Sequence, residues 1–292
     1  MKEIFKKIKP WGFSGLSIYD VTIFFWKGLI NGSITTRASS LAFNFFLAFF
    51  PSLIVFLTLI PYIPIEGIQE NLMELLAIVL PETTYEITFT TLEDIINNPR
   101  GGLLSIGFIL ALYFSTNGIN SLIEAFNSSY HIKEVRPLFE QRLLSLALTL
   151  LLSFMLIMTI GLIIFSKTTI THLTEFDKIS ILAADLIIYG RWLVMLIMLL
   201  VGISILFHIG PCLKEKWKLL TPGSIFTTIC IVSTSACFNY YINNFSQYNK
   251  IYGSIGTLMI ILIWMYFNAI ILLIGFELNA SISASKKEEN LE

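Results

Sequence analysis

The chain has 292 residues, of which 55% are hydrophobic and 13% are charged, and its mean hydropathy is +0.76. Soluble domains are roughly 45–50% apolar and about 25% charged, so this composition excludes an ordinary soluble domain and indicates an integral membrane protein. The formal net charge of −1 offers no basic surface for nucleic acid, and no nucleic-acid partner is expected.

Residues 1–36 are predicted to form a cytoplasmic arm that ends in an amphipathic helix. Apolar residues recur every three or four positions from Phe13 to Ile30, while Asp20, Lys27 and Asn31 occupy the other face. This pattern is typical of a helix that lies on the membrane surface. The helix is interpreted as an anchor, with a mobile gate as the alternative.

A membrane domain is predicted for residues 37–280. A crossing helix needs about 20 mainly apolar residues, and six segments meet that requirement: 38–61, 102–126, 140–165, 186–210, 219–242 and 253–279. The fold class is therefore an all-α membrane protein with a six-helix bundle. Pro51 lies inside the first span and predicts a kink there, and residues 281–292 are expected to form a cytoplasmic tail.

An acidic segment at 62–100 separates the first two predicted spans. It contains seven acidic residues and a single basic one, Arg100. Apolar residues keep helical spacing on either side of Pro81, which predicts two short amphipathic helices over the outer face of the bundle. The acidic face is interpreted as solvated, with a cation-attracting vestibule as the alternative.

The distribution of Lys and Arg predicts the orientation of the bundle. The arm, the second and fourth connections and the tail together carry fourteen of these residues, whereas the alternate connections carry four. Positive residues accumulate on the cytoplasmic side, so both termini are expected to be cytoplasmic. If the fourth span begins near Arg191, this side chain lies at the outer interface. If the span begins near Ser180, Arg191 lies deep and needs a partner from another helix.

Several polar residues fall inside the predicted spans, where lipid tails cannot satisfy them. Asn117, Asn120 and Glu124 have the spacing of one helix face. We consider two interpretations of these residues, interhelical hydrogen bonds and the lining of a hydrated path. The candidates for the path are Asn44, Asn117, Asn120, Glu124, Asn268 and Glu277. The hydrated-path interpretation predicts specifically that Glu277 contacts the polar helix face formed by Asn117, Asn120 and Glu124.

Residues that would support catalysis are sparse in this sequence. The three histidines lie in distant segments, so no metal site, and in particular no two-metal nuclease site, is predicted. His208 and Cys212 are four apart, but Pro211 disfavours a continuous helix between them. The glycines after Tyr252 lack the lysine of a phosphate-binding loop. No catalytic, cofactor-binding or metal-binding residue is expected, and the chain is not expected to be an enzyme.

Three sequence blocks resemble the YihY/BrkB family of bacterial inner-membrane proteins, which was formerly labelled ribonuclease BN. They are RASSLAFNFFLAFFPSLI at 37–54, RW at 191–192 with the proline that closes that span, and YGSIGTLMIILIWMYFNAIILLIGFELNA at 252–280. The motif positions are Arg37, Pro51, Arg191, Pro211, Tyr252, Gly253, Trp264, Gly275, Glu277 and Asn279. The resemblance implies a six-helix protein of the bacterial inner membrane, with roles in envelope integrity or export.

Two functions remain open from the sequence. The first is a transporter- or flippase-like protein that moves a lipid or small amphiphile in envelope maintenance. The second is a structural or interaction protein whose polar residues only hold the helices together. Membrane lipids are the expected partners in both cases, and the sequence specifies neither a substrate nor an oligomeric state.

Overall fold

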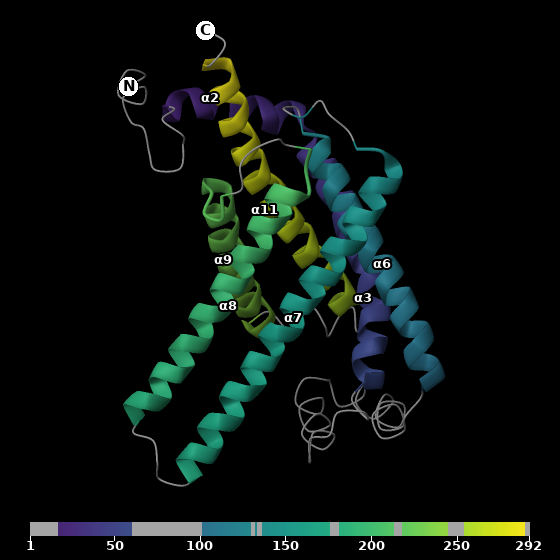
Figure 1. Ribbon diagram of the computed structural model, residues 1–292, viewed down its shortest axis with the longest axis vertical. Coiled ribbons are helices and arrows are strands. Elements are labelled where there is room, and N and C mark those ends of the chain that lie inside the picture. The colour runs from purple at the N-terminus through teal and green to yellow at the C-terminus, as the bar shows by residue number, and fades with distance from the viewer. Residues whose placement is uncertain are drawn as a thin grey trace. The chain divides into compact units, whose positions relative to one another are not determined.

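A computed structural model describes residues 17–59, 101–129, 132, 136–175, 181–212, 218–244 and 254–289 (Figure 1). Helices account for nearly all of these residues, and this described part contains no strand. The helices are α2 (Ile18–Asn31), α3 (Ile34–Leu59), α6 (Gly101–Asn127), α7 (Leu138–Glu175), α8 (Ile181–Ile209), α9 (Pro222–Asn244) and α11 (Ser254–Glu289). The predicted all-α fold class is thus confirmed. The acidic segment at 62–100 lies outside the described residues, as do Tyr252 and Gly253.

Five of the described helices are long and apolar enough to cross a membrane. Their spans are Ile34–Phe56, Gly101–Asn127, Leu138–Ile163, Ile187–Ile209 and Leu258–Lys286. The remaining predicted span, 219–242, forms helix α9. At 1.5 Å per residue this helix is about 35 Å long, but Ser233, Thr234 and Ser235 in its middle lower its hydropathy. The structure therefore supports five of the six predicted spans.

The chain divides into two compact units, and each is described by itself. The first unit comprises residues 1–43 and 119–292, and the second comprises residues 44–118. In the second unit, Gly107 of α6 faces Ile54 and Val55 of α3, and Gly118 faces the ring of Phe45. Helix α3 runs as one helix through Pro51.

Three buried aromatic rings form the centre of the first unit. Phe126 of α6, Phe207 of α8 and Phe276 of α11 are each at most 5% exposed. The ring centroids of Phe126 and Phe276 are 4.3 Å apart, and Phe207 lies 5.6 Å and 5.9 Å from them in edge-on geometry. Contacts of this kind are favourable beyond their buried area, so this aromatic cluster holds three helices together.

Helices α9 and α11 cross closely where both lack side chains. A Cβ atom at Gly275 would overlap the Thr227 hydroxyl, and a Cβ at Gly223 would overlap the backbone carbonyl of Gly275. Small residues at a crossing let membrane helices approach closely enough for backbone contact. The motif glycine Gly275 therefore has a packing role in this fold.

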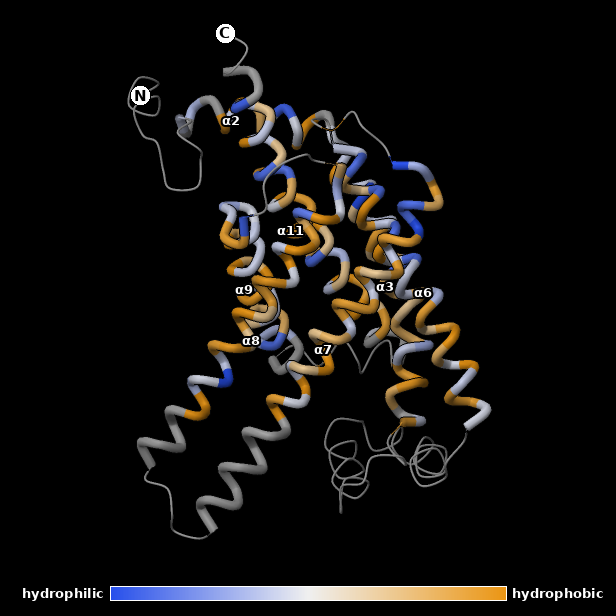
Figure 2. The backbone as a smooth tube through the Cα atoms, in the orientation of Figure 1, coloured by the Kyte–Doolittle hydropathy of each residue, from blue (hydrophilic) through white to orange (hydrophobic). Residues whose placement is uncertain are grey.

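The last part of α11 packs against α2. Val21 of α2 and Ile282 of α11 are both buried, with Leu278 packed beside them, and Figure 1 shows α2 lying across this end of α11. The predicted boundary at residue 280 falls inside α11, which continues to Glu289. Ser281, Ser283 and Ser285 are buried in this extension. In Figure 2, hydrophilic positions of the first unit gather toward this end, while α7 and α8 are mostly hydrophobic along their middle turns.

Candidate functional site

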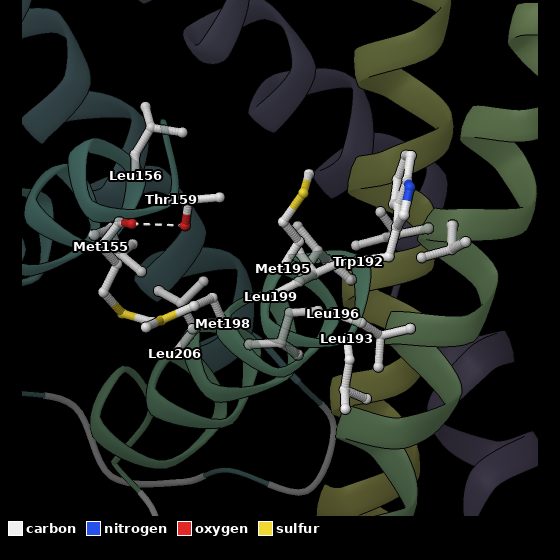
Figure 3. Close-up of a pocket in the computed structure, with 16 residues that line it drawn as sticks. Met155, Leu156, Thr159, Trp192, Leu193, Met195, Leu196, Met198, Leu199 and Leu206 are labelled. Carbon is white, nitrogen blue, oxygen red and sulfur yellow. Dashed lines mark hydrogen bonds between the residues drawn. The ribbon is translucent and has the colours of Figure 1, made fainter. Parts of the chain in front are cut away.

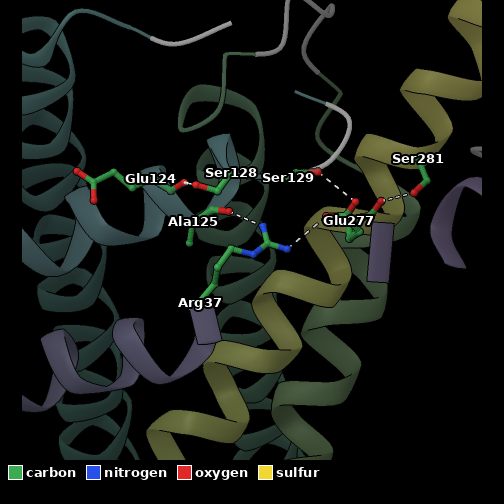
Figure 4. A network of polar contacts seen from close by, with 7 residues as sticks. All are labelled: Arg37, Glu124, Ala125, Ser128, Ser129, Glu277 and Ser281. Atoms are coloured by element: carbon green, nitrogen blue, oxygen red, sulfur yellow. Dashed lines mark hydrogen bonds and ion pairs between the residues drawn. The ribbon is translucent and has the colours of Figure 1, made fainter. Parts of the chain in front are cut away.

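A charged pair is buried where α3 meets α11 (Figure 4). The Arg37 Nη2 atom lies 3.8 Å from Glu277 Oε2, and the side chains are 10% and 0% exposed. The Arg37 Nη1 group donates to the carbonyl of Ala125 at 2.6 Å, and the Ser129 hydroxyl donates to Glu277 Oε1 at 3.0 Å. We call these residues the charged cluster. It joins α3, the end of α6 and α11 through groups that would be expensive to bury alone.

A second set of polar side chains joins α6 to α7. The Asn120 amide donates to Glu124 Oε1 at 2.6 Å, and Gln141 Nε2 donates to Asn120 Oδ1 at 3.0 Å and to Glu124 Oε1 at 3.3 Å. Ser145 also donates to Asn120 Oδ1 at 3.3 Å. Asn120, Gln141 and Ser145 are buried, whereas Glu124 is exposed. We call these four residues the amide cluster.

The two clusters are neighbours, and their carboxylates do not point at one another. Figure 4 shows Arg37 between Glu124 and Glu277, with the Glu124 carboxylate directed away from Glu277. The connection runs through the backbone, because Arg37 binds the carbonyl of Ala125, the residue after Glu124. The structure thus assigns Glu277 to Arg37 and Ser129, and Glu124 to Asn120 and Gln141.

Three candidates for the polar path remain, Asn44, Asn117 and Asn268. Asn44 and Asn117 belong to the second unit. Asn268 donates to the carbonyl of Trp264 at 2.8 Å, one turn earlier in its own helix α11. The arrangement in the first unit therefore brings together Asn120 with Glu124, and Arg37 with Glu277, while the hydrated path through all six candidates stays a prediction.

Polar side chains also form hydrogen bonds with two helix ends in the first unit, the start of α9 and the end of α8. Asn279 Oδ1 accepts from the amide of Gly223 at 2.9 Å, and its amide donates to the Thr221 hydroxyl at 2.9 Å. Arg136 donates to the carbonyls of Gly210 at 2.5 Å and of Pro211 at 3.1 Å. A cation at the carboxyl end of α8 also suits the helix dipole. Asn279 thus gains a structural role as a motif residue, whereas Pro211 contributes its backbone carbonyl.

Sequence reasoning missed five side chains of these networks. Arg136 contributed only to the orientation count, and Ser129, Gln141, Ser145 and Thr221 were not singled out. Gln141, Ser145 and Thr149 recur at intervals of four on α7, which is a polar stripe at helical spacing. This polar stripe is the sequence feature from which the contact of α7 with Asn120 could have been predicted.

An open apolar groove lies between α7, α8, α9 and α11 in the first unit (Figure 3). Its volume is about 750 Å³, and it is lined by Leu152, Met155, Leu156, Thr159, Trp192, Leu193, Met195, Leu196, Met198, Leu199, Gly202, Ile203, Leu206, Ile231, Val232 and Leu272. The one hydroxyl in this set, on Thr159, donates to the carbonyl of Met155 at 2.8 Å. Leu156 and Leu193 are 61% and 59% exposed, so the groove opens toward the surroundings of the bundle.

The described residues contain no group of three or more side chains suited to hold a metal ion. Helix α8 ends at Ile209, so His208 and Cys212 do not share a helix face. The amide of Cys212 donates to Asn127 Oδ1 at 2.9 Å. This connection fixes the start of the loop after α8.

Comparison with known proteins identifies the family. A family model described as "Virulence factor BrkB" matches residues 25–292. The chain belongs to the BrkB family. This result confirms the resemblance drawn from the three sequence blocks, and it identifies the chain as a membrane protein with several apolar helices.

Several relatives of this BrkB-family chain are known. It is 31% identical to a ribonuclease-like protein, YfkH, of Bacillus subtilis over 252 residues. The matched region is 86% of this chain and 91% of the relative. A UPF0761 membrane protein of Aggregatibacter aphrophilus is 21% identical over 280 residues, with 92% and 94% covered. One from Stenotrophomonas maltophilia is 25% identical over 191 residues, which is 63% of this chain but 42% of that protein. No solved structure matches the chain.

Proposed function

We propose that this BrkB-family protein is a transporter- or flippase-like protein for a lipid or small amphiphile, without enzymatic activity. The observation that supports the proposal is the apolar groove. Its volume of about 750 Å³ falls in the range of roughly 300–1,000 Å³ typical of small-molecule sites. Its lining offers a hydrocarbon chain close contact but offers almost no polar group.

The proposed setting is the bacterial inner membrane, with both termini cytoplasmic and α9 as the sixth span. An even number of spans is required to return the chain to the side where it began. The end of the first unit that contains the charged cluster, α2 and the end of α11 would then face the cytoplasm. Ile23, Trp26 and Ile30 of α2 are exposed, which suits a helix resting on the membrane interface.

A structural role is the second candidate, and a different observation favours it. The charged cluster, the amide cluster and the contacts of Arg136 and Asn279 all join one helix to another or to a helix end. Hydrogen bonds of this kind stabilise helix association in membranes whether or not anything is transported.

Reconstitution distinguishes the two functions. The purified full chain is placed in phospholipid vesicles that contain a trace of a fluorescent phospholipid, and a membrane-impermeant reductant destroys the fluorescence of exposed label. In protein-free vesicles the inner half of the label survives. Transport predicts that the surviving fraction falls in vesicles that contain the protein.

A groove-filling substitution provides the matched comparison. A Cβ at Gly202 would contact Leu152 and Met155 at ordinary distances of 3.6 and 3.8 Å, so the side chain of Gly202→Leu would extend into the groove. Gly190 of the same helix has nothing within 4 Å of its Cβ position. Gly202→Leu should abolish lipid movement and Gly190→Leu should retain it. If lipid moves no faster in vesicles that contain the wild-type protein than in protein-free vesicles, transport is rejected and the structural role is favoured.

A further inference from the structure

One arginine, Arg191, directly precedes the groove-lining residue Trp192 on α8. Arg191 follows the start of the candidate span Ile187–Ile209 by four residues and is partly buried. Tyr189 and Trp192 flank it with exposed fractions of 71% and 59%. Exposed Tyr and Trp residues are typical of the level of the lipid headgroups. These exposed aromatic residues favour the placement in which the fourth span begins near Arg191, at the boundary between headgroups and acyl chains, although helix α8 itself begins earlier, at Ile181.

Arg191 shares its helix face with the groove. At about 100° per residue, Arg191, Met195, Met198, Gly202 and Leu206 fall within an arc of about 80° on α8. The last four of these residues line the groove. At 1.5 Å per residue, the distance along α8 from Arg191 to Leu206 is about 22 Å. The hydrocarbon region of one leaflet is about 15 Å thick, so this face is long enough to contact one acyl chain along its length.

The guanidinium of Arg191 has no hydrogen bond or ion pair with any residue that the structure describes. A charged side chain inside the apolar region is costly without a partner, and it becomes less so when it reaches the interface. An anionic oxygen is the partner that an arginine binds most strongly. The lipid phosphate is the group that carries such oxygens at this depth.

We propose that Arg191 and the groove form a binding site for an anionic membrane phospholipid. The phosphate binds the Arg191 guanidinium, and one acyl chain lies along Met195, Met198 and Gly202 toward Leu206. The proposal rests on the function proposed above and deepens it, because it names the class of amphiphile. Apolar contact alone does not favour the groove over bulk lipid, since lipid tails are as apolar as leucine. Selectivity must therefore come from the charge at Arg191.

The test measures binding and does not depend on transport. The full chain in detergent is incubated with equal amounts of phosphatidylglycerol and phosphatidylcholine that have identical acyl chains, and bound lipid is counted by native mass spectrometry. One arginine near a membrane surface favours an anionic lipid by about fivefold. We expect this preference in the wild type, its loss in Arg191→Gln, and its retention in Arg191→Lys.

The groove is tested with the glycine pair of α8. Gly202→Leu should lower the binding of both lipids by at least about fivefold, because its side chain would occupy space that the acyl chain needs, and Gly190→Leu should leave both unchanged. Equal binding of the two lipids by the wild type, or an unchanged preference in Arg191→Gln, would overturn the headgroup assignment. Unchanged binding in Gly202→Leu would overturn the groove assignment.

A crosslinking experiment keeps the proposal testable if a variant does not fold. Phosphatidylglycerol with a photoreactive group in its acyl chain is bound to the wild-type chain. Crosslinks should map to the groove-lining residues of α7 and α8, and crosslinks scattered over all lipid-facing helices would contradict the site. If phosphatidylglycerol binds as proposed but no lipid moves in vesicles, the transport function fails and the site stands. If lipid moves while the preference survives in Arg191→Gln, the site fails and the function stands.

Discussion

The substitution Glu277→Gln tests whether the buried charged pair holds the first unit together. It preserves the shape of the side chain and removes its negative charge. The Glu277 side chain is fully buried, and the Arg37 side chain is 10% exposed. The variant would leave the arginine charge buried with the carbonyl of Ala125 as its remaining described hydrogen-bond acceptor.

The expected cost follows from the geometry of the pair. Removing one partner of a buried ion pair typically costs about 3–5 kcal/mol, because the other charge stays buried. The Arg37 Nη2–Glu277 Oε2 distance of 3.8 Å is long for a direct ion pair, and Arg37 retains its bond to Ala125. We therefore expect a loss near the lower limit, about 3 kcal/mol of unfolding free energy.

Unfolding in mixed micelles, by titration with sodium dodecyl sulfate followed by circular dichroism, measures this loss. Glu124→Gln is the matched control, because Glu124 is exposed and its amide replacement still offers an oxygen to Asn120 and Gln141. The control should lose less than about 1 kcal/mol. The double variant Arg37→Leu with Glu277→Leu removes both charges and should be more stable than Glu277→Gln.

Two results would refute this reasoning. If Glu277→Gln is no less stable than Glu124→Gln, the burial of the carboxylate does not determine its contribution. If the double variant is no more stable than Glu277→Gln, the loss does not arise from the unpaired arginine charge.

The same titration tests two further substitutions. In Gly28→Ala, the new Cβ would overlap the carboxylate of Glu277, so we expect a loss of about 1–3 kcal/mol. Gly161→Ala has nothing within 4 Å of its Cβ and should be neutral or gain up to about 1 kcal/mol; equal effects would mean that α2 does not rest on α11. Asn279→Leu loses two hydrogen bonds from α11 to the start of α9, to Thr221 and Gly223, of about 0.6–1.7 kcal/mol each. Asn268→Leu loses only a bond within its own helix, and a larger loss of stability for Asn268→Leu would contradict these assignments.

The membrane character and most spans could be predicted because both depend on local composition. A run of about 20 apolar residues is visible in sequence without any knowledge of neighbours. Helix α9 shows where this approach reaches its limit, since its hydroxyl-bearing residues lower its hydropathy although its length suffices to cross. Thr227 and Thr228 of this helix are buried by the fold, and that burial arises from tertiary packing.

The partners inside the clusters could not be predicted in the same way. The sequence placed Glu277 among the intramembrane polar residues. It identified Arg37 only as a motif residue and as one of the positive charges that set the orientation. Their pairing joins positions that are far apart in the chain, and no periodicity links them. The spacing of Asn120 and Glu124 was informative, because a shared helix face brings these two side chains into direct contact.

The groove and the aromatic cluster together define what transport would demand of this fold. Leu206 lines the groove, and the next residue, Phe207, packs against Phe126 and Phe276. The groove therefore reaches the level of the aromatic cluster along α8. Passage of a lipid between the helices at this level would require α6, α8 and α11 to separate, whereas a structural protein could keep the cluster closed. Arg136 and the charged cluster join these same helices at their ends. Transport would require these contacts to loosen, whereas a structural role would require them to stay closed.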